Sequence, residues 1–249
     1  MEILGLDIGG SGIKGAIVDT SEGILLTPRH RIETPQPATP KAVITTVNEI
    51  IDFFNWKGPV GCGFPAAIVN EVVMTASNID DSWIGLNAAD EIKKLTGCAA
   101  HLINDVDAAG LAEVIYGAGK GVKGSVLMVA AGTGIGTALF YDGKLFPNTE
   151  LGHLRLKSGK ISEKYAANSI KEEKDLSWKE WAGRLNEYLN LLDDLFWPEL
   201  IIFGGGVSKY HEEFFKYLQI RPRIVPAKMK NEAGMIGAAI HARIKEFSD

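Results

Sequence analysis

Apolar runs alternate with glycine-rich turns along the first part of the chain. Residues 2–8 are predicted to form a strand, and residues 13–19 and 23–33 continue it as an antiparallel meander. The proline-rich segment 34–40 is a stiff connector. Apolar residues at helical spacing then predict a helix over 43–54.

The same reading assigns elements to the rest of the chain. Further strands are expected at 60–64, 99–103, 125–131, 136–141 and 200–203, and further helices at 86–95, 106–117, 177–196 and 232–247. Strands and helices alternate in two successive sets, which predicts an α/β fold built from a duplicated unit. No low-complexity linker separates the sets, so we expect a two-lobed molecule rather than independent domains.

A glycine-rich turn occurs twice, each time between two predicted strands. The first turn contains Gly9, Gly10, Ser11 and Gly12, and the second contains Gly132, Thr133 and Gly134. Such turns expose backbone N–H groups that no side chain blocks, and these groups bind phosphate. The spacing of Gly10, Gly12 and Gly15 also matches a dinucleotide fingerprint, but a strand rather than a helix is predicted after it. Phosphoryl transfer is therefore favoured over an NAD-binding oxidoreductase.

Polar residues at predicted strand ends are candidates for chemistry. Asp7 ends the first strand and could hold Mg²⁺, directly or through water, or merely cap the turn. Lys14 could direct its cation at a transferring phosphate, or be an exposed hairpin lysine. Asp105 could be the general base that takes a proton from a sugar hydroxyl, with Asn104 binding a neighbouring hydroxyl. The alternative is that both residues cap the following helix.

Two further segments carry candidate ligands. Glu150 and His153 flank a glycine soon after the second hairpin, and could bind vicinal hydroxyls or belong to a polar loop. Gly204, Gly205 and Gly206 follow a buried strand and are predicted to open a helix, where free N–H groups could hold the distal part of a phosphate donor. Trp178 and Trp181, on the helix 177–196, are interpreted as core or interface anchors rather than ligand contacts.

Composition narrows the function classes. The 249 residues have a net charge of −5 and are 46% hydrophobic, which is typical of a globular protein and argues against a broad nucleic-acid surface. No apolar run is long enough for a membrane span, and no cleavable leader precedes the first strand, so a cytoplasmic location is expected. Cys62 and Cys98 are expected to be unpaired core residues.

Together these segments resemble the ROK family of sugar kinases, over nearly the whole chain. The resemblance rests on residues 5–15, 102–110, 132–136 and 150–153. The strings 34–40, 76–85, 147–153 and 204–209 are most similar to a branch of the family that phosphorylates glucose with inorganic polyphosphate. The resemblance implies an actin–hexokinase-like (ribonuclease H-like) duplicated fold with two lobes and an interlobe cleft. Residues 1–105 would form the small lobe, joined by the C-terminal helix 233–249, and residues 106–232 the large lobe.

The resemblance also implies roles for residues. Asp105 matches the catalytic base. The sugar ligands it implies are Asn78, Asn104, Glu150, His153 and Glu163, and the phosphate cradle comprises Asp7, Gly9, Gly10, Ser11, Gly12, Lys14, Gly132, Thr133 and Gly134. Many family members carry a cysteine-rich zinc loop before the residue equivalent to Glu163. The segment 154–162 contains no cysteine, so no structural zinc is expected, and Phe64-Pro65-Ala66-Ala67 lacks the usual glycine after the proline.

The expected reaction is Mg²⁺-dependent phosphoryl transfer from polyphosphate, or from ATP, to the 6-hydroxyl of glucose. A linear polyanion needs an extended positive groove, for which Lys120, Lys123 and the cluster Arg155, Lys157, Lys160 and Lys164 are candidates. An ATP-dependent kinase for glucose or mannose is the main alternative. A sugar-sensing regulator is less favoured, because the first strand starts too early for a preceding DNA-binding region. A homodimer is implied by the resemblance alone.

Overall fold

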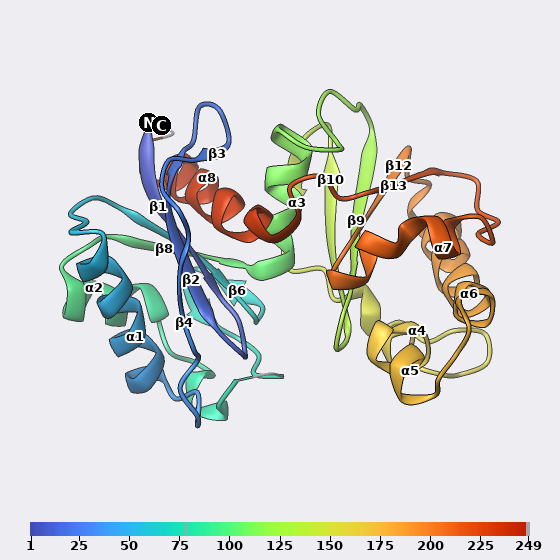
Figure 1. The fold of residues 1–249 in the computed structure, drawn as a ribbon, viewed down its shortest axis with the longest axis horizontal. Helices are drawn as coiled ribbons and strands as arrows, with labels where there is room; N and C mark the ends of the chain where they lie inside the picture. The colour runs from blue at the N-terminus through green and yellow to red at the C-terminus, as the bar shows by residue number, and fades with distance from the viewer. Residues whose placement is uncertain (78, 248–249) are drawn as a thin grey trace. The chain divides into compact units, whose positions relative to one another are not determined.

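The computed structural model describes residues 1–77 and 79–247, so the expectation for Asn78 and the last two residues of the predicted helix 233–249 lie outside the described residues. The chain divides into two compact units (Figure 1). The first unit comprises Met1–Ala112 together with the C-terminal segment from Asn231, and the second comprises Glu113–Lys230. Each unit contains one of the two glycine turns.

The first unit is built on a mixed sheet with the strand order β3-β2-β1-β5-β8, and β4 also pairs with β2. Its strands are β1 (Glu2–Ile8), β2 (Ile13–Asp19), β3 (Ile24–Leu25), β4 (His30–Ile32), β5 (Val60–Phe64) and β8 (Ala100–Asn104). Strands β1 and β2 are antiparallel, and their register places Asp7 opposite Lys14. Strands β5 and β8 run parallel to β1, so Asn104 lies at a carboxyl end of the sheet.

Two helices cover one face of this sheet. Helices α1 (Pro40–Phe53) and α2 (Ala88–Thr96) pack against one another, as Figure 1 shows. Thr39 caps α1, with its hydroxyl accepting a hydrogen bond from the amide of Ala42. The apolar sides of these helices form a core with the sheet that includes both Cys62 and Cys98, which are buried and unpaired as expected. Burial raises the pKa of the Cys62 thiol.

The C-terminal helix α8 (Ala233–Phe247) packs against strands β1, β5 and β8. Two glycines allow this close approach. A Cβ at Gly5 would lie 2.1 Å from the carbonyl oxygen of Met235, and one at Gly61 would lie 2.0 Å from that of Ala238. Both positions therefore require glycine for steric reasons.

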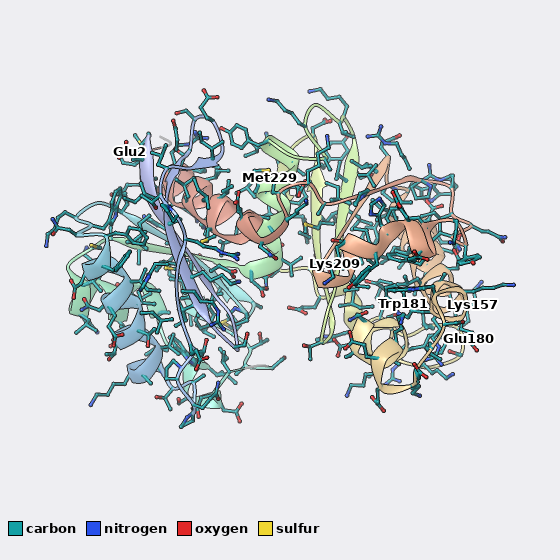
Figure 2. All side chains as sticks on the ribbon, viewed as in Figure 1. Glu2, Lys157, Glu180, Trp181, Lys209 and Met229 are labelled. Carbon is teal, nitrogen blue, oxygen red and sulfur yellow. The ribbon has the colours of Figure 1, made fainter. Side chains whose placement is uncertain are left out.

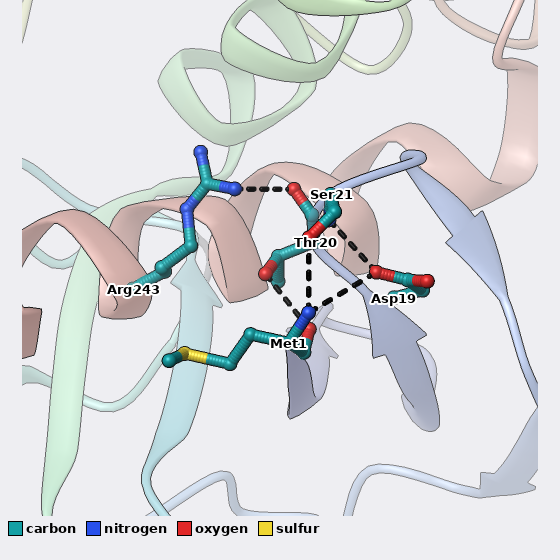
Figure 3. Close-up of polar contacts among 5 residues, drawn as sticks. All are labelled: Met1, Asp19, Thr20, Ser21 and Arg243. Carbon is teal, nitrogen blue, oxygen red and sulfur yellow. Dashed lines mark hydrogen bonds and ion pairs between the residues drawn. The ribbon is translucent and has the colours of Figure 1, made fainter.

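Helix α8 is also joined to the far end of β2 by hydrogen bonds (Figure 3). The guanidinium of Arg243 donates to the carbonyl oxygen of Thr20 at 2.6 Å. The Thr20 hydroxyl donates to the carbonyl of Met1 at 2.8 Å, and the amino group of Met1 lies 3.3 Å from Oδ1 of Asp19. These contacts hold the helix, the end of the hairpin and the start of β1 together.

The remaining elements of the first unit are short, except for helix α3 (Asp105–Ile115), which begins directly after β8. The short elements are the hairpin of β6 (Ile68–Val69) and β7 (Val72–Val73) and the 3₁₀ turn η1 (Asp81–Trp83). The division into units falls after Ala112 and after Lys230, whereas the sequence analysis placed it after residues 105 and 232. The first turns of α3 pack on α8, because a Cβ at Gly237 would lie 1.7 Å from the carbonyl oxygen of Ala108.

The second unit has a five-stranded sheet with the order β11-β10-β9-β12-β13. Its strands are β9 (Ser125–Ala131), β10 (Ile135–Tyr141), β11 (Lys144–Phe146), β12 (Leu200–Gly204) and β13 (Arg223–Pro226), and its helices are α4 (Glu163–Ala166), α5 (Asn168–Glu173), α6 (Trp178–Phe196) and α7 (His211–Phe215). Short 3₁₀ turns are η2 (Leu151–His153), η3 (Gly206–Tyr210) and η4 (Lys230–Glu232).

Helix α6 carries much of the core of the second unit. It begins with a capping box, in which the Ser177 side chain and Glu180 satisfy one another's backbone amides. Trp181 is fully buried, and its indole N–H donates to the carbonyl of Ala166 at 2.9 Å. Its ring packs edge-on against Phe214, with centroids 4.8 Å apart. The prediction that Trp181 is a core anchor is thus confirmed (Figure 2).

Most predicted elements are present, but two predictions were wrong in detail and some short strands were not predicted. Residues 23–33 form two short strands, β3 and β4, rather than one, because Thr27–Arg29 leave the ladder. Residues after Gly205 form the 3₁₀ turn η3 before α7, not an α-helix that starts at the glycines. The hairpin β6–β7 and the strands β11 and β13 were not predicted, since each has only two to four residues.

Candidate active site

The first glycine turn has carbonyl oxygens that are held by side chains. The amide of Gly9 donates to the carbonyl of Gly12 at 3.1 Å and closes the turn. The guanidinium of Arg31 donates to the carbonyl of Ser11 at 2.8 Å. The Thr34 hydroxyl donates to the carbonyl of Gly9.

Gln36 completes this support, because its amide donates to the carbonyl of Gly10 at 3.3 Å. The amides of Gly10, Ser11 and Gly12 donate to no acceptor in the part of the chain that the structure describes. A turn with its carbonyls occupied and its N–H groups unpaired is suited to an anion. The strand β4 and the connector after it, which supply the donors, were not identified as part of the site from the sequence.

Asp7 and Lys14 face one another across the hairpin. The ammonium of Lys14 lies 2.8 Å from Oδ2 of Asp7, and the two side chains are 28% and 20% exposed. Gly234, at the start of α8, lies beside the carboxylate, since a Cβ there would be 3.3 Å from Oδ1. The absence of a side chain at Gly234 leaves room beside Oδ1. A carboxylate with such room suits Mg²⁺, which keeps several waters and binds phosphate oxygens.

Asn104 and Asp105 lie where β8 ends and α3 begins. Oδ1 of Asn104 accepts hydrogen bonds from the amides of Val106 at 2.9 Å and Asp107 at 3.1 Å, so this side chain caps the helix. Its amide nitrogen donates to the carbonyl of Ala66 at 3.1 Å. Oδ1 of Asp105 also accepts from the amide of Val106, at 2.9 Å. Both residues therefore cap the helix. The side-chain amide of Asn104 has two N–H groups, and the one that does not donate to Ala66 can bind a ligand.

The second glycine turn has the same kind of support. The amide of Gly132 donates to the carbonyl of Gly134 at 2.9 Å. Ser169 holds two carbonyls, with its amide donating to Gly132 at 3.0 Å and its hydroxyl to Thr133 at 2.6 Å. Among the described residues, the amides of Thr133 and Gly134 have no acceptor. Ser169 lies 36 positions after Thr133, and no local pattern in the sequence indicates its role.

Glu150, His153 and Glu163 come together in the second unit. Nε2 of His153 lies 3.7 Å from Oε1 of Glu163. Burial is the main cause of a raised pKa of Glu150, with the charge of Glu163 adding to the rise and that of His153 opposing it. Gly152 packs against β10, since a Cβ there would lie 2.1 Å from the carbonyl of Ile135. Oxygen acceptors beside an imidazole suit a polyhydroxylated ligand.

The loop that carries Glu150 is clamped to β10. The Thr137 hydroxyl donates to the carbonyl of Thr149 at 2.7 Å, and the Thr149 hydroxyl donates to that of Thr137 at 3.0 Å. The buried Ser162 hydroxyl donates to the carbonyl of Leu154 at 2.8 Å and closes the segment that precedes Glu163. Within residues 1–77 and 79–247, no three His, Cys, Asp or Glu side chains form a metal-type group.

A cleft of about 620 Å³ lies in the second unit beside both of its glycine segments. Gly132 and Thr133 line it, and so does Gly206, which follows Gly204 and Gly205 in the turn after β12. A Cβ at Gly132 or Gly206 would meet nothing within 4 Å, so both backbones face open space. Gly205 has a φ of +84°, which favours glycine.

Trp178 also lines this cleft, together with Tyr210, Lys171 and Lys209. Trp178 also packs against the core of the second unit, as predicted, and that it makes no ligand contact stays a prediction. The two lysines are the cations of the cleft, and the sequence analysis missed them. Figure 2 labels Lys209, which belongs to the 3₁₀ turn η3.

The lysines and the arginine predicted to form a polyphosphate groove do not line this cleft. The ammonium of Lys160 lies over the ring of Tyr165, 4.4 Å from its centroid, and that of Lys120 lies 5.9 Å from the centroid of Tyr116. Arg155 donates to the carbonyl of Gly159 at 3.0 Å and braces its own loop. That these residues form a groove for polyphosphate stays a prediction.

None of the helices that the structure describes is long and apolar enough to cross a membrane.

The chain is similar to named proteins over most of its length. It is 46% identical over 237 residues to a polyphosphate glucokinase of Mycobacterium tuberculosis (strain CDC 1551 / Oshkosh), which covers 95% of this chain and 89% of that protein. It is 45% identical to the polyphosphate glucokinase of Mycobacterium leprae (strain TN), over 95% of this chain and 73% of that one.

Solved structures match the fold. The inorganic polyphosphate/ATP-glucomannokinase of Arthrobacter sp. strain KM aligns with a TM-score of 0.92 at 45% identity, covering 98% of this chain and 99% of that one. A ROK family glucokinase from Streptomyces griseus, in complex with glucose and AMPPNP, aligns with a TM-score of 0.82 at 23% identity, covering 98% and 99%. The predicted actin–hexokinase-like α/β fold is confirmed by these matches.

The family model described as "ROK family" matches residues 3–167, which contain both glycine turns, the end of β8 and the loop of Glu150. The chain belongs to the ROK family.

Proposed function

We propose that this chain is a phosphotransferase that moves the terminal phosphoryl group of inorganic polyphosphate to the 6-hydroxyl of glucose. The observation that carries the proposal is the 46% identity to a polyphosphate glucokinase over 95% of the chain. Two turns with unpaired amides, one in each unit, support a phosphorylated donor. A carboxylate at a strand end and a cluster of oxygen acceptors support a sugar acceptor.

The donor phosphates bind the amides of Gly10, Ser11 and Gly12 in the first unit and those of Thr133 and Gly134 in the second. Lys14 compensates negative charge that develops on the transferring group. Asp7 holds Mg²⁺, directly or through water, and the ion would shield the phosphate oxygens from the incoming hydroxyl. Gly204, Gly205 and Gly206 hold the distal part of the donor.

Asp105 is the general base of the proposed reaction. It accepts the proton of the 6-hydroxyl while the bond from that oxygen to phosphorus forms, and the bridging P–O bond to the rest of the donor breaks. Asn104, Glu150, His153 and Glu163 bind the other hydroxyls and orient the sugar. Asn78, for which the same role was expected, lies outside the described residues. Binding and orientation, rather than covalent catalysis, supply most of the rate enhancement.

The proposal is tested by incubating the purified protein with glucose, MgCl₂ and either polyphosphate or ATP, and measuring glucose 6-phosphate. We expect product with polyphosphate at a kcat/KM at least equal to that with ATP. Product with ATP alone would overturn polyphosphate as the donor, and no product with either would overturn the kinase. Omitting Mg²⁺ and adding a chelator should abolish turnover.

A second candidate is a kinase of broader range, which accepts ATP and mannose as well. The structure described as a polyphosphate/ATP-glucomannokinase, at 45% identity, favours it. The same assay with mannose decides between the two. Comparable kcat/KM values for both sugars and both donors would establish the broader activity.

The dinucleotide fingerprint does not fit the fold. The residues after Gly12 form strand β2 instead of the helix that a dinucleotide site needs. We propose that the enzyme acts in the cytoplasm, where both substrates of the reaction would be available, and that it forms a homodimer. Sedimentation of the purified protein tests the homodimer.

A further inference from the structure

The cleft of the second unit has two aromatic rings whose faces carry lysine ammonium groups. Nζ of Lys171 lies 4.1 Å from the centroid of a Trp178 ring, and Nζ of Lys209 lies 4.7 Å from that of Tyr210. The two rings are themselves neighbours, with centroids 5.7 Å apart and planes tilted by 45°. All four side chains line the cleft.

The two ammonium groups are available to a ligand. Neither lysine forms an ion pair with a carboxylate in the portion of the chain that the structure describes. The only other charged residue lining the cleft there is Glu172, whose Oε1 accepts a hydrogen bond from the side chain of Asn168 at 2.8 Å. Two cations thus face one carboxylate, and the cleft favours an anion.

The position of the lysines discriminates between kinds of anionic donor. A flat heteroaromatic base would have to displace an ammonium group from a ring before it could stack there. A chain of phosphates needs no such displacement, since its oxygens pair with the ammonium groups where they lie. Gly132, Thr133 and Gly206 line the same cleft, and the amide of Thr133, which has no acceptor among the described residues, is suited to a phosphate of such a chain.

We propose that Lys171 and Lys209 are specificity-determining residues that select a polyphosphate chain over a nucleoside triphosphate, by binding phosphates distal to the transferred one. This inference rests on the proposed function and adds to it the path of the donor. The path runs along the cleft that Trp178 and Tyr210 line, past the two lysines, and not along the charged segment 155–164. The lysines touch only the distal donor, so they are not catalytic residues.

The test compares both donors in the variants K171M, K209M and the double variant. Methionine keeps the unbranched side chain up to the position of Cε and removes the ammonium group with its charge. The matched control is K216M, because Lys216 also lies over a tyrosine ring, 5.5 Å from the centroid of Tyr217, and is 55% exposed. Each variant is assayed with glucose at saturation, at two salt concentrations, with long-chain polyphosphate and with ATP.

We expect kcat/KM for polyphosphate to fall about 10-fold in each single variant and about 100-fold in the double variant, as the loss of a charge-assisted contact implies. The salt dependence of the polyphosphate KM should become weaker in the same order. The kcat/KM for ATP should stay within about 3-fold of wild type or rise. K216M should behave as wild type with both donors.

Three results would overturn the inference. An unchanged kcat/KM for polyphosphate in the double variant would exclude the lysines from the donor path. An equal loss with ATP would assign them to phosphates that both donors share. An equal loss in K216M would indicate an effect of net charge alone. A wild-type protein without any polyphosphate-dependent product would instead overturn the proposed function, and this inference with it.

Discussion

Lys14 and Asp7 are register partners across the first hairpin, and their side chains form an ion pair with a distance of 2.8 Å between Nζ and Oδ2. The residue assigned to the donor phosphates and the residue assigned to the metal thus hold one another. The ion pair fixes the orientation of the carboxylate beside the glycine turn. In the proposed reaction, binding of the donor and Mg²⁺ would exchange this contact for one between Lys14 and phosphate and one between Asp7 and the ion.

This ion pair predicts different effects of two substitutions on the Mg²⁺ concentration that the enzyme requires. Asp7→Asn should lower kcat by about 100-fold or more and raise the Mg²⁺ concentration for half-maximal rate, because a carboxylate ligand is lost. Lys14→Met should lower kcat by about 10- to 100-fold but should not raise that concentration, because the carboxylate loses a competing cation. Titrations of initial rate with MgCl₂ measure both. Equal Mg²⁺ dependence in the two variants would argue against Asp7 as the metal ligand.

Asp105→Asn should lower kcat by about 10²- to 10⁴-fold and leave glucose affinity nearly intact, because the general base is lost while the shape of the side chain stays. The start of α3 should be preserved, since Asn104 accepts the amides of Val106 and Asp107. Turnover assays and calorimetric titration with glucose measure the two effects. Near-wild-type turnover with intact glucose binding would exclude Asp105 as the base.

Gly206→Val should block the donor without damaging the fold. The residue begins the 3₁₀ turn η3, where an L-residue is accommodated, and its Cβ would face open space in the cleft. We expect kcat/KM for polyphosphate to fall at least 10-fold, because the valine occupies volume that the donor needs. The melting temperature should change by less than about 3 °C. A valine variant with unchanged donor kinetics would show that the donor bypasses the cleft.

His241 makes the stability of the first unit depend on pH. The pKa of His241 is lowered to about 4, mainly by burial, with the charge of Glu71 opposing this shift and the charges of Lys245 and His101 adding to it. The unfolded chain therefore binds a proton near pH 6.5 that the folded chain does not, and stability falls between about pH 6.5 and pH 4. The difference amounts to roughly 3 kcal/mol at most.

His101 acts in the opposite direction. The carboxylate of Glu71, 3.8 Å from Nδ1, is the main cause of a raised pKa of His101, and the hydrogen bond between Nε2 and Glu246 contributes to it. The stability that His101 contributes is therefore present below about pH 6.5 and is lost as the pH rises through the raised pKa. Urea unfolding at pH 7.5 and pH 5 should show a smaller loss in His241→Phe than in wild type, and a larger loss in His101→Gln. If His241→Phe loses as much stability as wild type, the burial of this imidazole does not cause the effect.

The fold could be predicted from the sequence because the patterns that indicate its strands and helices are local. The strand character on both sides of each glycine turn follows from apolar residues next to the turn, and the helix 177–196 follows from its period and its serine cap. The 3₁₀ turn after Gly205 could not be distinguished from a helix start, because both begin with the same glycine chemistry.

The supporting residues of the site could not be found in this way. Arg31, Thr34 and Gln36 hold the first turn, and Ser169 holds the second, from positions far along the chain. The sequence has no local mark for a side chain whose partner is a distant carbonyl. Lys171 and Lys209 were missed for a related reason. What marks them as candidate ligands is their contact with the rings of Trp178 and Tyr210 in the cleft, which only the fold reveals.

The contacts of Gly5 and Gly61 with helix α8 also set the order in which the chain can complete its structure. All strands of the second unit lie between residues 125 and 226, so they are synthesised before α8. The sheet of the first unit is translated earlier, but one of its apolar faces stays uncovered until α8 has emerged and packed on it. The first unit thus begins to be synthesised first and closes its core last, and its open apolar face is exposed to aggregation in the meantime.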